Sequence, residues 1–228
     1  FIKNPRHIEV QIIADGKGNA IHLGTRDCSM QRRHQKIIEE APALDVNENS
    51  LEETLGACLR LCKNIAYSGV GTLEFLYEND RFYFIEMNTR IQVEHPVSEM
   101  ITGFDIVKAQ LKIALDMPIT LDQKEIAVRG HAIECRINAE DPETFVPSPG
   151  VISKMHPPGG FGVRFDSHIY SGYKVPPYYD SLLAKIITTA NTRESCIKRM
   201  LSALDEFFVE GISTNHSLHQ KLLKDEIF

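Results

Sequence analysis

The chain lacks several motifs that would have indicated its class directly. Neither a GxxxxGK[ST] phosphate-binding loop nor a GxGxxG dinucleotide motif occurs in its 228 residues, so any nucleotide must be bound by another arrangement. Its five cysteines include no CxxC pair, and Cys58 and Cys62, four residues apart, favour small core residues on a helix over a metal site. Unpaired thiols of this kind are typical of a reducing, cytoplasmic compartment.

Positive charge and long apolar runs are also scarce. The 25 Lys and Arg residues are outnumbered by 31 Asp and Glu, which gives a net charge of −6 and argues against a nucleic-acid surface as the main function. No apolar run is long enough to span a bilayer, and we find no basic amphipathic leader or small-residue cleavage site. The composition, 43% hydrophobic and 25% charged, is that of a globular protein, and we expect no nucleic-acid or membrane partner.

The hydrophobic pattern predicts an α+β fold with an antiparallel sheet and flanking helices, not βαβ repeats. Strands are expected over residues 7–15, 20–24, 37–42, 130–138 and 182–188, and a polar loop over residues 26–36. Helices are expected over residues 49–67, 97–101, 106–114, from 191 or 192 onward, and 215–223. Residues 1–128 carry most of the negative charge, so a boundary near residues 118–129 predicts two regions, 1–128 and 129–228.

One stretch, residues 84–96, carries polar side chains at every second position. The polar set consists of Glu86, Asn88, Arg90, Gln92 and Glu94. The apolar set at the other positions consists of Met87, Ile91 and Val93. Because an extended chain sends alternate side chains to opposite faces, one face can pack while the other presents carboxylates, amides and a guanidinium. The plain alternative is a half-exposed edge strand with a solvated face.

The preceding residues, 71–86, predict a β-hairpin, because two aromatic-rich runs flank turn residues. If residues 79–81 form the loop, Glu74 lies directly opposite Glu86, and the two carboxylates repel unless a cation lies between them. With the amide of Asn88 they predict a Mg²⁺ site, since Mg²⁺ is typically held by one or two carboxylates plus substrate phosphates. A two-residue loop would shift the register by one and separate the pair.

Three further features have both a chemical and a plain interpretation. Residues 31–36 form either a basic surface loop or, beside an acidic metal pair, a site for an anion such as a nucleotide phosphate. Arg90 can hold a small planar anion with Glu94 as its general base, or the two can form a simple salt bridge. Arg136 can pair with Glu134 on its own strand, or it can face the same cleft.

Long blocks of the sequence resemble biotin carboxylase. They are MQRRHQK at residues 30–36, FIEMNTRIQVEHP at 84–96 and RGHAIECRINAEDP at 129–142, followed by PPGGFGVR at 157–164 and PPYYDS at 176–181. The resemblance covers essentially all 228 residues and is strongest to the biotin carboxylase subunit of bacterial acetyl-CoA carboxylase. The carboxylase domains of pyruvate and propionyl-CoA carboxylases share most of these blocks.

The resemblance implies a fold and a reaction. Residues 1–128 would form the carboxyl-terminal part of an ATP-grasp domain, and residues 129–228 the biotin carboxylase carboxyl-terminal domain. The implied enzyme uses ATP with Mg²⁺ or Mn²⁺ to activate bicarbonate as carboxyphosphate, and then carboxylates biotin on the biotin carboxyl carrier protein. This is the first half-reaction of acetyl-CoA carboxylase in fatty acid synthesis. Carboxyltransferase subunits are further implied partners, and the implied homodimer is formed through the region of Phe161 and Arg164.

The resemblance also assigns roles to single residues. The implied metal ligands are Glu74, Glu86 and Asn88. The implied ATP contacts are Ile2, His7, Gln31, His34, Glu74 and Glu86. The implied pocket for bicarbonate and biotin consists of Lys36, Arg90, Gln92, the backbone of Val93, and Arg136. Glu94 is the implied base, and the implied catalytic set is Lys36, Arg90, Glu94 and Arg136.

We also expect this chain to be part of a longer protein, because it starts at Phe1 without a helix or strand start of its own. The family has a preceding domain and a glycine-rich lid, so the chain alone should show little or no turnover, since water would reach a labile acyl phosphate. Two alternatives stay open. One is a non-catalytic folded half that only binds a partner; the other is another ATP-grasp ligase such as a carbamoyl-phosphate synthetase, which leaves the blocks around Arg136 and Tyr178 unexplained.

Overall fold

A continuous antiparallel sheet of eight strands forms the frame of the molecule, in the order β5-β4-β1-β2-β3-β6-β11-β9. The computed structural model describes residues 2–226 and 228. The sheet strands are β1 Arg6–Asp15, β2 Ala20–Arg32, β3 Gln35–Ala41, β4 Ser68–Glu78, β5 Arg81–Asn88, β6 His131–Asn138, β9 Val163–Ser167 and β11 Leu182–Ala190. Two small sheets pair β7 Gly150–Val151 with β10 Lys174–Val175, and β8 Lys154–His156 with β12 Phe208–Glu210.

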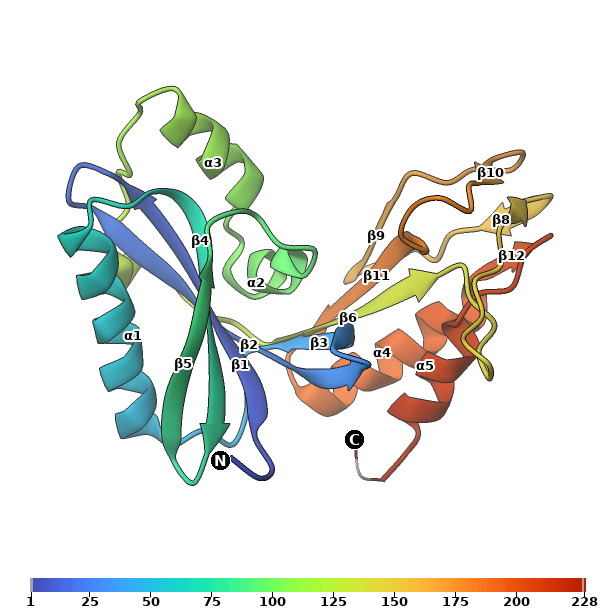
Figure 1. The fold of residues 1–228 in the computed structure, drawn as a ribbon, viewed down its shortest axis with the longest axis horizontal. Coiled ribbons are helices and arrows are strands. Elements are labelled where there is room, and N and C mark those ends of the chain that lie inside the picture. Colours follow the sequence, from blue (N-terminus) through green and yellow to red (C-terminus); the bar gives the residue numbers. More distant parts are fainter. Residues whose placement is uncertain (1, 227) are drawn as a thin grey trace.

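The described residues form five α-helices that pack against the sheet, and Figure 1 shows their arrangement. They are α1 Glu48–Asn64, α2 His95–Thr102, α3 Ile106–Ala114, α4 Arg193–Glu206 and α5 His216–Leu223, with a 3₁₀ helix at Gln123–Glu125. Helix α1 packs beside β1 and β5, while α4 and α5 pack beneath β6 and β11 at the other end of the sheet. None of the helices in the described residues is long and apolar enough to cross a membrane.

The helix ends follow from local chemistry. The side chains of Asn47, Asp105 and Thr192 accept hydrogen bonds from the first-turn amides of α1, α3 and α4, as residues of these types do at N-caps. Gly103 ends α2 in the left-handed conformation, with φ of 68°, which glycine adopts without a steric cost. The sequence therefore placed this break between two helices correctly.

The largest buried apolar cluster lies under β6, β11 and α4. Ile133, Ile137 and Ile186 of the strands pack there against Met200 and Leu204 of α4. A second cluster places Cys58 and Cys62 of α1 against β1 and β4, which agrees with their interpretation as core residues. Both thiols are buried and free, and so are the other three cysteines.

The polar loop expected over residues 26–36 is wrong. Strand β2 continues to Arg32, a tight turn at Arg33 and His34 with φ of 50° and 65° reverses the chain, and β3 follows at once. The charged residues belong to strands because many of their side chains meet partners on the other strands rather than water. Arg26 is the clearest example of a charged strand residue shielded from water, because its side chain is 0% exposed.

The hairpin of β4 and β5 corrects one expectation and confirms another. Its loop is the two-residue turn Asn79-Asp80, not residues 79–81, since Glu78 already pairs with Arg81. Glu74 is nevertheless opposite Glu86, because a β-bulge lies between the pairs Phe75–Phe84 and Glu74–Glu86 and takes up Ile85. The bulged residue restores the register that the shorter loop would have shifted. Strand β5 then ends at Asn88, so the segment after it is not a strand.

The two regions expected at residues 1–128 and 129–228 share this sheet. Strand β3 of the first pairs with β6 of the second, with Ile38 opposite Cys135 and Glu39 opposite Glu134. The division between them stays a prediction, but the described strands join its two sides directly. Side chains from both regions can therefore reach one cavity.

Candidate active site

An open cavity of about 880 Å³ lies along the polar face of β3, β4, β5 and β6. Of the site residues expected from the sequence, its lining includes His7, Gln31, His34, Lys36, Glu74, Glu86, Asn88, Arg90, Gln92, Val93, Glu94 and Arg136. Only Ile2 among the expected site residues is absent from the lining, and Phe161 and Arg164 lie elsewhere. The structure thus brings together residues that are as much as 129 positions apart in the chain, from His7 to Arg136.

Lys36 is held by three carboxylates. Its ammonium lies 2.8 Å from Glu94 Oε1 and 3.2 Å from Glu74 Oε1, and it also contacts Glu9. Burial opposes the charged form, but Glu9 and Glu94 outweigh it and raise the pKa of Lys36, so this ammonium stays charged. Lys36 therefore acts as a fixed positive charge in the cavity wall.

Arg136 faces the cleft and is not paired with Glu134 on its own strand. Its Nε donates to Glu39 Oε1 at 2.5 Å, and its Nη2 donates to Glu94 Oε2 at 3.0 Å. Glu94 thus has one cation on each oxygen, Lys36 on Oε1 and Arg136 on Oε2. It sits at the N-cap position of α2 without capping the helix, which leaves its carboxylate for these contacts.

Arg90 differs from the other two cations. It is exposed, and its recorded hydrogen bond runs from Nη1 to the carbonyl of Ile91 at 3.1 Å. Among the described residues it has no salt bridge to Glu94, so the plain interpretation of that pair is wrong. A guanidinium without a carboxylate partner at the mouth of a cavity is suited to bind a small anion.

Glu74, Glu86 and Asn88 meet at the strand pair of the hairpin. The Nδ2 of Asn88 donates to Glu74 Oε1 and to Glu86 Oε1, both at 3.0 Å. Amide orientation is assigned from such networks, and a rotated Asn88 would present its oxygen beside the two carboxylates. The oxygen donors of these three residues fit a Mg²⁺ ion, which prefers hard oxygen ligands.

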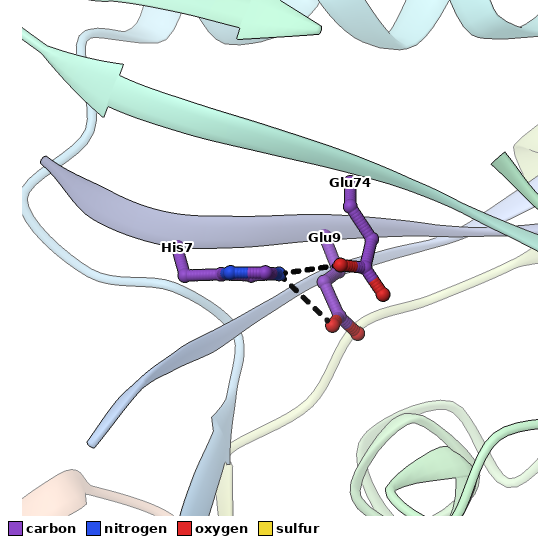
Figure 2. A group of neighbouring side chains, drawn as sticks. All are labelled: His7, Glu9 and Glu74. Atoms are coloured by element: carbon purple, nitrogen blue, oxygen red, sulfur yellow. Dashed lines mark ion pairs between the residues drawn. The ribbon is translucent and has the colours of Figure 1, made fainter. Parts of the chain in front are cut away.

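His7 adds an imidazole to the same corner (Figure 2). Its Nε2 lies 2.8 Å from Glu74 and 3.4 Å from Glu9. Burial works against the charged ring, but the two carboxylates outweigh burial and raise the pKa of His7 to about 9. Burial opposes the charged form of both carboxylates as well, but their cation partners outweigh it and lower the pKa values of Glu9 and Glu74 to about 2, so both are ionised and pair with the imidazolium.

Below the cavity floor, Arg26 is the centre of a buried network that the sequence did not reveal. Its guanidinium donates to Glu9 Oε2 at 2.8 and 3.0 Å, to Gln11 Oε1 at 2.6 Å and to Gln92 Oε1 at 2.8 Å. The amide of Gln92 is thereby oriented, so that its Nε2 donates to Glu74 Oε1 at 2.7 Å. Alternation of His7, Glu9 and Gln11 along β1 is the one sequence signal that could have found part of it.

The remaining expected residues have simpler surroundings. Gln31 donates to the carbonyl of Cys28 at 2.8 Å, and His34 is exposed in the turn after β2. The carbonyl of Val93 accepts a hydrogen bond from the ammonium of Lys185 at 2.7 Å, a contact that the sequence did not suggest. Glu39, which accepts from Arg136, is a second residue that the sequence did not suggest.

Comparison with known proteins agrees with this geometry. Residues 1–123 match the family described as "Carbamoyl-phosphate synthase L chain, ATP binding domain", and residues 134–228 match "Biotin carboxylase C-terminal domain". Biotin carboxylase of Pseudomonas aeruginosa is 60% identical over the whole chain, which covers 51% of that protein.

Solved structures give the same result. A biotin carboxylase–β-γ-ATP complex from Campylobacter jejuni is 49% identical, with a TM-score of 0.97 over 100% of this chain and 51% of that one. The biotin carboxylase domain dimer of Hydrogenobacter thermophilus 2-oxoglutarate carboxylase, in complex with MgADP, ADP and bicarbonate, is 48% identical. Its TM-score is 0.96, over 99% of this chain and 50% of that one.

The fold is that of the biotin carboxylase ATP-grasp structures. The chain belongs to the family of the carbamoyl-phosphate synthase L chain ATP-binding domain and, more narrowly, corresponds to the carboxyl-terminal portion of biotin carboxylase. It spans about half the length of the curated relatives it matches.

Proposed function

We propose that the protein containing this chain carboxylates biotin with bicarbonate in a reaction driven by ATP. The observation that carries the proposal is the buried carboxylate of Glu94, held between Lys36 and Arg136 in a cavity that Arg90 also lines. Lys36 and Arg136 contact Glu94, and Arg90 lines the same cavity, so positive charge and a carboxylate base are both available to a small anion that must give up a proton. The similarity to biotin carboxylases over the whole chain supports the same reaction.

In this proposal bicarbonate binds to the cations and Glu94 acts as its base. The guanidinium of Arg90 has no carboxylate partner among the described residues, so it is available to hold the planar anion through two hydrogen bonds. Glu94 accepts the proton, and the bicarbonate oxygen then attacks the terminal phosphoryl group of ATP to give carboxyphosphate and ADP. Lys36 and Arg136 stabilise the negative charge that gathers on the oxygens.

Glu74, Glu86 and Asn88 would hold Mg²⁺ or Mn²⁺, which when bound neutralises charge on the ATP phosphates. His7, Gln31 and His34 would contact the nucleotide from the turn and strand ends at the same side of the cavity. Ile2 would approach the adenine. The Hydrogenobacter relative, crystallised with MgADP and bicarbonate, supports this set of ligands.

Arg136 would also act in the second step, in which carboxyphosphate supplies the carboxyl group to biotin. A guanidinium aimed at the ureido oxygen stabilises the enolate form of biotin, and loss of one such donor typically costs about 3–4 kcal/mol. Lys185 fixes the carbonyl of Val93 at 2.7 Å, so the backbone of this segment is held in place for the substrate.

The finer assignments are also proposals. Biotin would arrive on a biotin carboxyl carrier protein, carboxyltransferase subunits would use the product in fatty acid synthesis, and the parent would be a homodimer. Phe161 is 94% exposed, and the side chain of Arg164, which donates to Glu99 at 2.6 Å, is 32% exposed, which supports a contact of this region with a second copy. The Hydrogenobacter relative is a dimer of its biotin carboxylase domain, which supports this arrangement.

We also propose that this chain alone turns over slowly or not at all. The cavity is open and its metal-binding residue Glu86 is exposed, so these residues alone do not exclude water from carboxyphosphate. A preparation whose intact mass is that of this chain only, and which nevertheless has the activity of the full-length enzyme, would contradict this.

The test of the main proposal is ADP release by the full-length protein with MgATP and bicarbonate, with and without free biotin. We expect biotin to stimulate release and Arg136→Ala to abolish the stimulation, with a loss of about 10²–10³ in rate. The matched control is Arg60→Ala, an exposed arginine on α1 outside the cavity, which should behave as wild type. Release that is indifferent to both biotin and bicarbonate would show that the fold is right and the reaction wrong.

A further inference from the structure

Two carboxyl groups lie directly opposite each other behind Arg136. Glu39 on β3 and Glu134 on β6 are cross-strand partners in the register of the sheet, and both have 0% exposure. Directly opposed side chains in antiparallel strands have Cβ atoms about 5 Å apart. Neither residue belongs to the catalytic or metal-binding set proposed above, so their presence in the interior needs its own explanation.

The hydrogen bonds of the pair are incomplete. Glu39 Oε1 accepts from Arg136, but Glu39 Oε2 has no partner, and neither carboxyl oxygen of Glu134 has one among the described residues. Ile187 of β11 is the cross-strand partner of Glu134, and it belongs to an apolar cluster with Val97 and Ile101 of α2. An ionised carboxylate without a cation or donor is strongly disfavoured in such surroundings and takes up a proton instead.

A count of charges leads to the same result. The buried carboxyls of the polar network are those of Glu9, Glu39, Glu74, Glu94 and Glu134. The cations that contact them are His7, Arg26, Lys36 and Arg136. Five carboxyls therefore face four cations, and Glu134 is the one that none of these cations contacts.

The groups that face the pair from the surrounding elements do not change this balance. They are Arg136 on β6, Lys185 on β11, Glu94 before α2, Glu9 on β1, and the thiols of Cys28 and Cys135. Lys185 donates to the carbonyl of Val93 and lies 3.7 Å from Asp166, so its charge is already offset. Burial and the proximity of Glu39 raise the pKa of Glu134 well above its usual value, and burial also raises that of Glu39.

We propose that Glu39 and Glu134 form a carboxyl pair that carries one negative charge at neutral pH and positions the guanidinium of Arg136 against Glu94. The charge lies on Glu39, which accepts from Nε of Arg136, and the proton lies on Glu134. Both Nε and Nη2 lie 2.5 Å from Glu39 Oε1, so Glu39 holds this edge of the planar guanidinium and leaves Nη2 within 3.0 Å of Glu94 Oε2. A neutral Glu134 does not compete with Glu94 for Arg136. Glu39 and Glu134 are positioning residues in this account, since they act through Arg136.

The first experiment measures protonation and does not depend on catalytic activity. Only the effect of the pair on catalysis rests on the proposed function. Infrared spectra of the full-length protein at pH 7.5 should show the C=O band of a protonated carboxylic acid. Glu134→Gln should remove this band, and Glu52→Gln, an exposed control on α1, should keep it. A wild-type spectrum without the band, or one that Glu134→Gln leaves unchanged, would overturn the proposal whether or not the protein carboxylates biotin.

The second experiment tests positioning. In protein labelled with ¹⁵N-arginine, Glu39→Gln should shift the Nε–H resonance that Arg136→Ala identifies, while Glu52→Gln should not. In ADP-release assays Glu39→Gln should lower kcat about tenfold without raising the KM for ATP, and should add little to Arg136→Ala. Glu134→Ala should lower kcat, whereas Glu134→Gln, which mimics the neutral acid, should keep most of the wild-type kcat. A Gln variant as impaired as the Ala variant, or an unmoved Arg136 resonance, would refute the positioning role.

Discussion

Replacing Arg26 by methionine should destabilise the protein substantially, because the substitution removes the cation at the centre of a fully buried network. Arg26 is 0% exposed and gives Glu9 two of its hydrogen bonds. Methionine fills a similar volume with apolar atoms, so the change removes charge and hydrogen bonds more than packing. The buried carboxylate of Glu9 then keeps only the contacts with Lys36 and His7.

The size of the effect follows from those partners. Breaking a buried ion pair by removing one member typically costs about 3–5 kcal/mol. Glu9 keeps its contacts with Lys36 and His7, which places the expected loss near the lower end, at about 3 kcal/mol. For a protein of this size, 1 kcal/mol corresponds to roughly 2–4 °C, so the melting temperature should fall by about 6–12 °C.

The loss should also depend on pH. Burial disfavours the charged form of Glu9, but Arg26, His7 and Lys36 outweigh it and lower the pKa of Glu9 to about 2. A carboxyl whose folded pKa is lowered stabilises the fold above its unfolded pKa, and this contribution is lost as pH falls. Because Arg26→Met removes part of that contribution, the difference between variant and wild type should be largest at neutral pH and should shrink below about pH 4.5.

Urea and thermal unfolding of four proteins would measure this: wild type, Arg26→Met, Glu9→Gln and the double variant. The double variant should be more stable than Arg26→Met alone, with a coupling energy of up to about 3 kcal/mol, because it leaves no unpaired buried charge. Arg60→Met, an exposed arginine on α1, is the control and should stay within about 0.5 kcal/mol. A loss below about 1 kcal/mol, or strict additivity, would refute the reasoning.

Burial lowers the pKa of His219 to about 4, so stability should fall by up to about 3 kcal/mol as pH drops from 6.5 toward 4, where only the unfolded chain binds the proton. Acid unfolding curves of His219→Gln should lose this slope, and an unchanged slope would contradict it. All five thiols are buried, so a thiol reagent should label none rapidly in the native protein and all five in urea; rapid native labelling would contradict their burial. Glu86→Gln should raise the Mg²⁺ concentration for half-maximal ADP release about tenfold, and Glu52→Gln should not. Equal Mg²⁺ dependence of these two variants would exclude Glu86 from the metal set.

The hairpin shows how a sequence pattern can predict a contact for the wrong local reason. Two aromatic-rich runs around Asn79-Asp80 predict the hairpin correctly, and Glu74 does face Glu86. The expected loop of three residues would have produced this register, but the structure reaches it with two loop residues and a bulge at Ile85. A bulge has no clear sequence signal here, because Ile85 is as good a strand residue as its neighbours.

The polar residues of β2 and β3 show the opposite failure. Periodicity treats a run of charged residues as exposed, whereas Arg26 and Glu39 are buried because charged partners on other strands meet them there. Those partners, Glu9 on β1 and Arg136 on β6, lie 17 and 97 residues away. Local sequence cannot indicate such pairings. It offered the connection between the basic segment and the acidic hairpin only as one of two interpretations, and the resemblance to a whole family favoured it.

The resulting arrangement explains why the cavity needs both predicted regions. An unbroken series of ion pairs runs from Lys36 through Glu94 and Arg136 to Glu39, and it crosses from β3 to β6, where the two regions join. Neighbours in such a series hold one another in place, so a substitution of Lys36 or Glu39 should change the positions of Glu94 and Arg136. The pairing of β3 with β6 therefore serves the proposed chemistry as much as the fold, since it sets the place of Arg136 relative to Glu94.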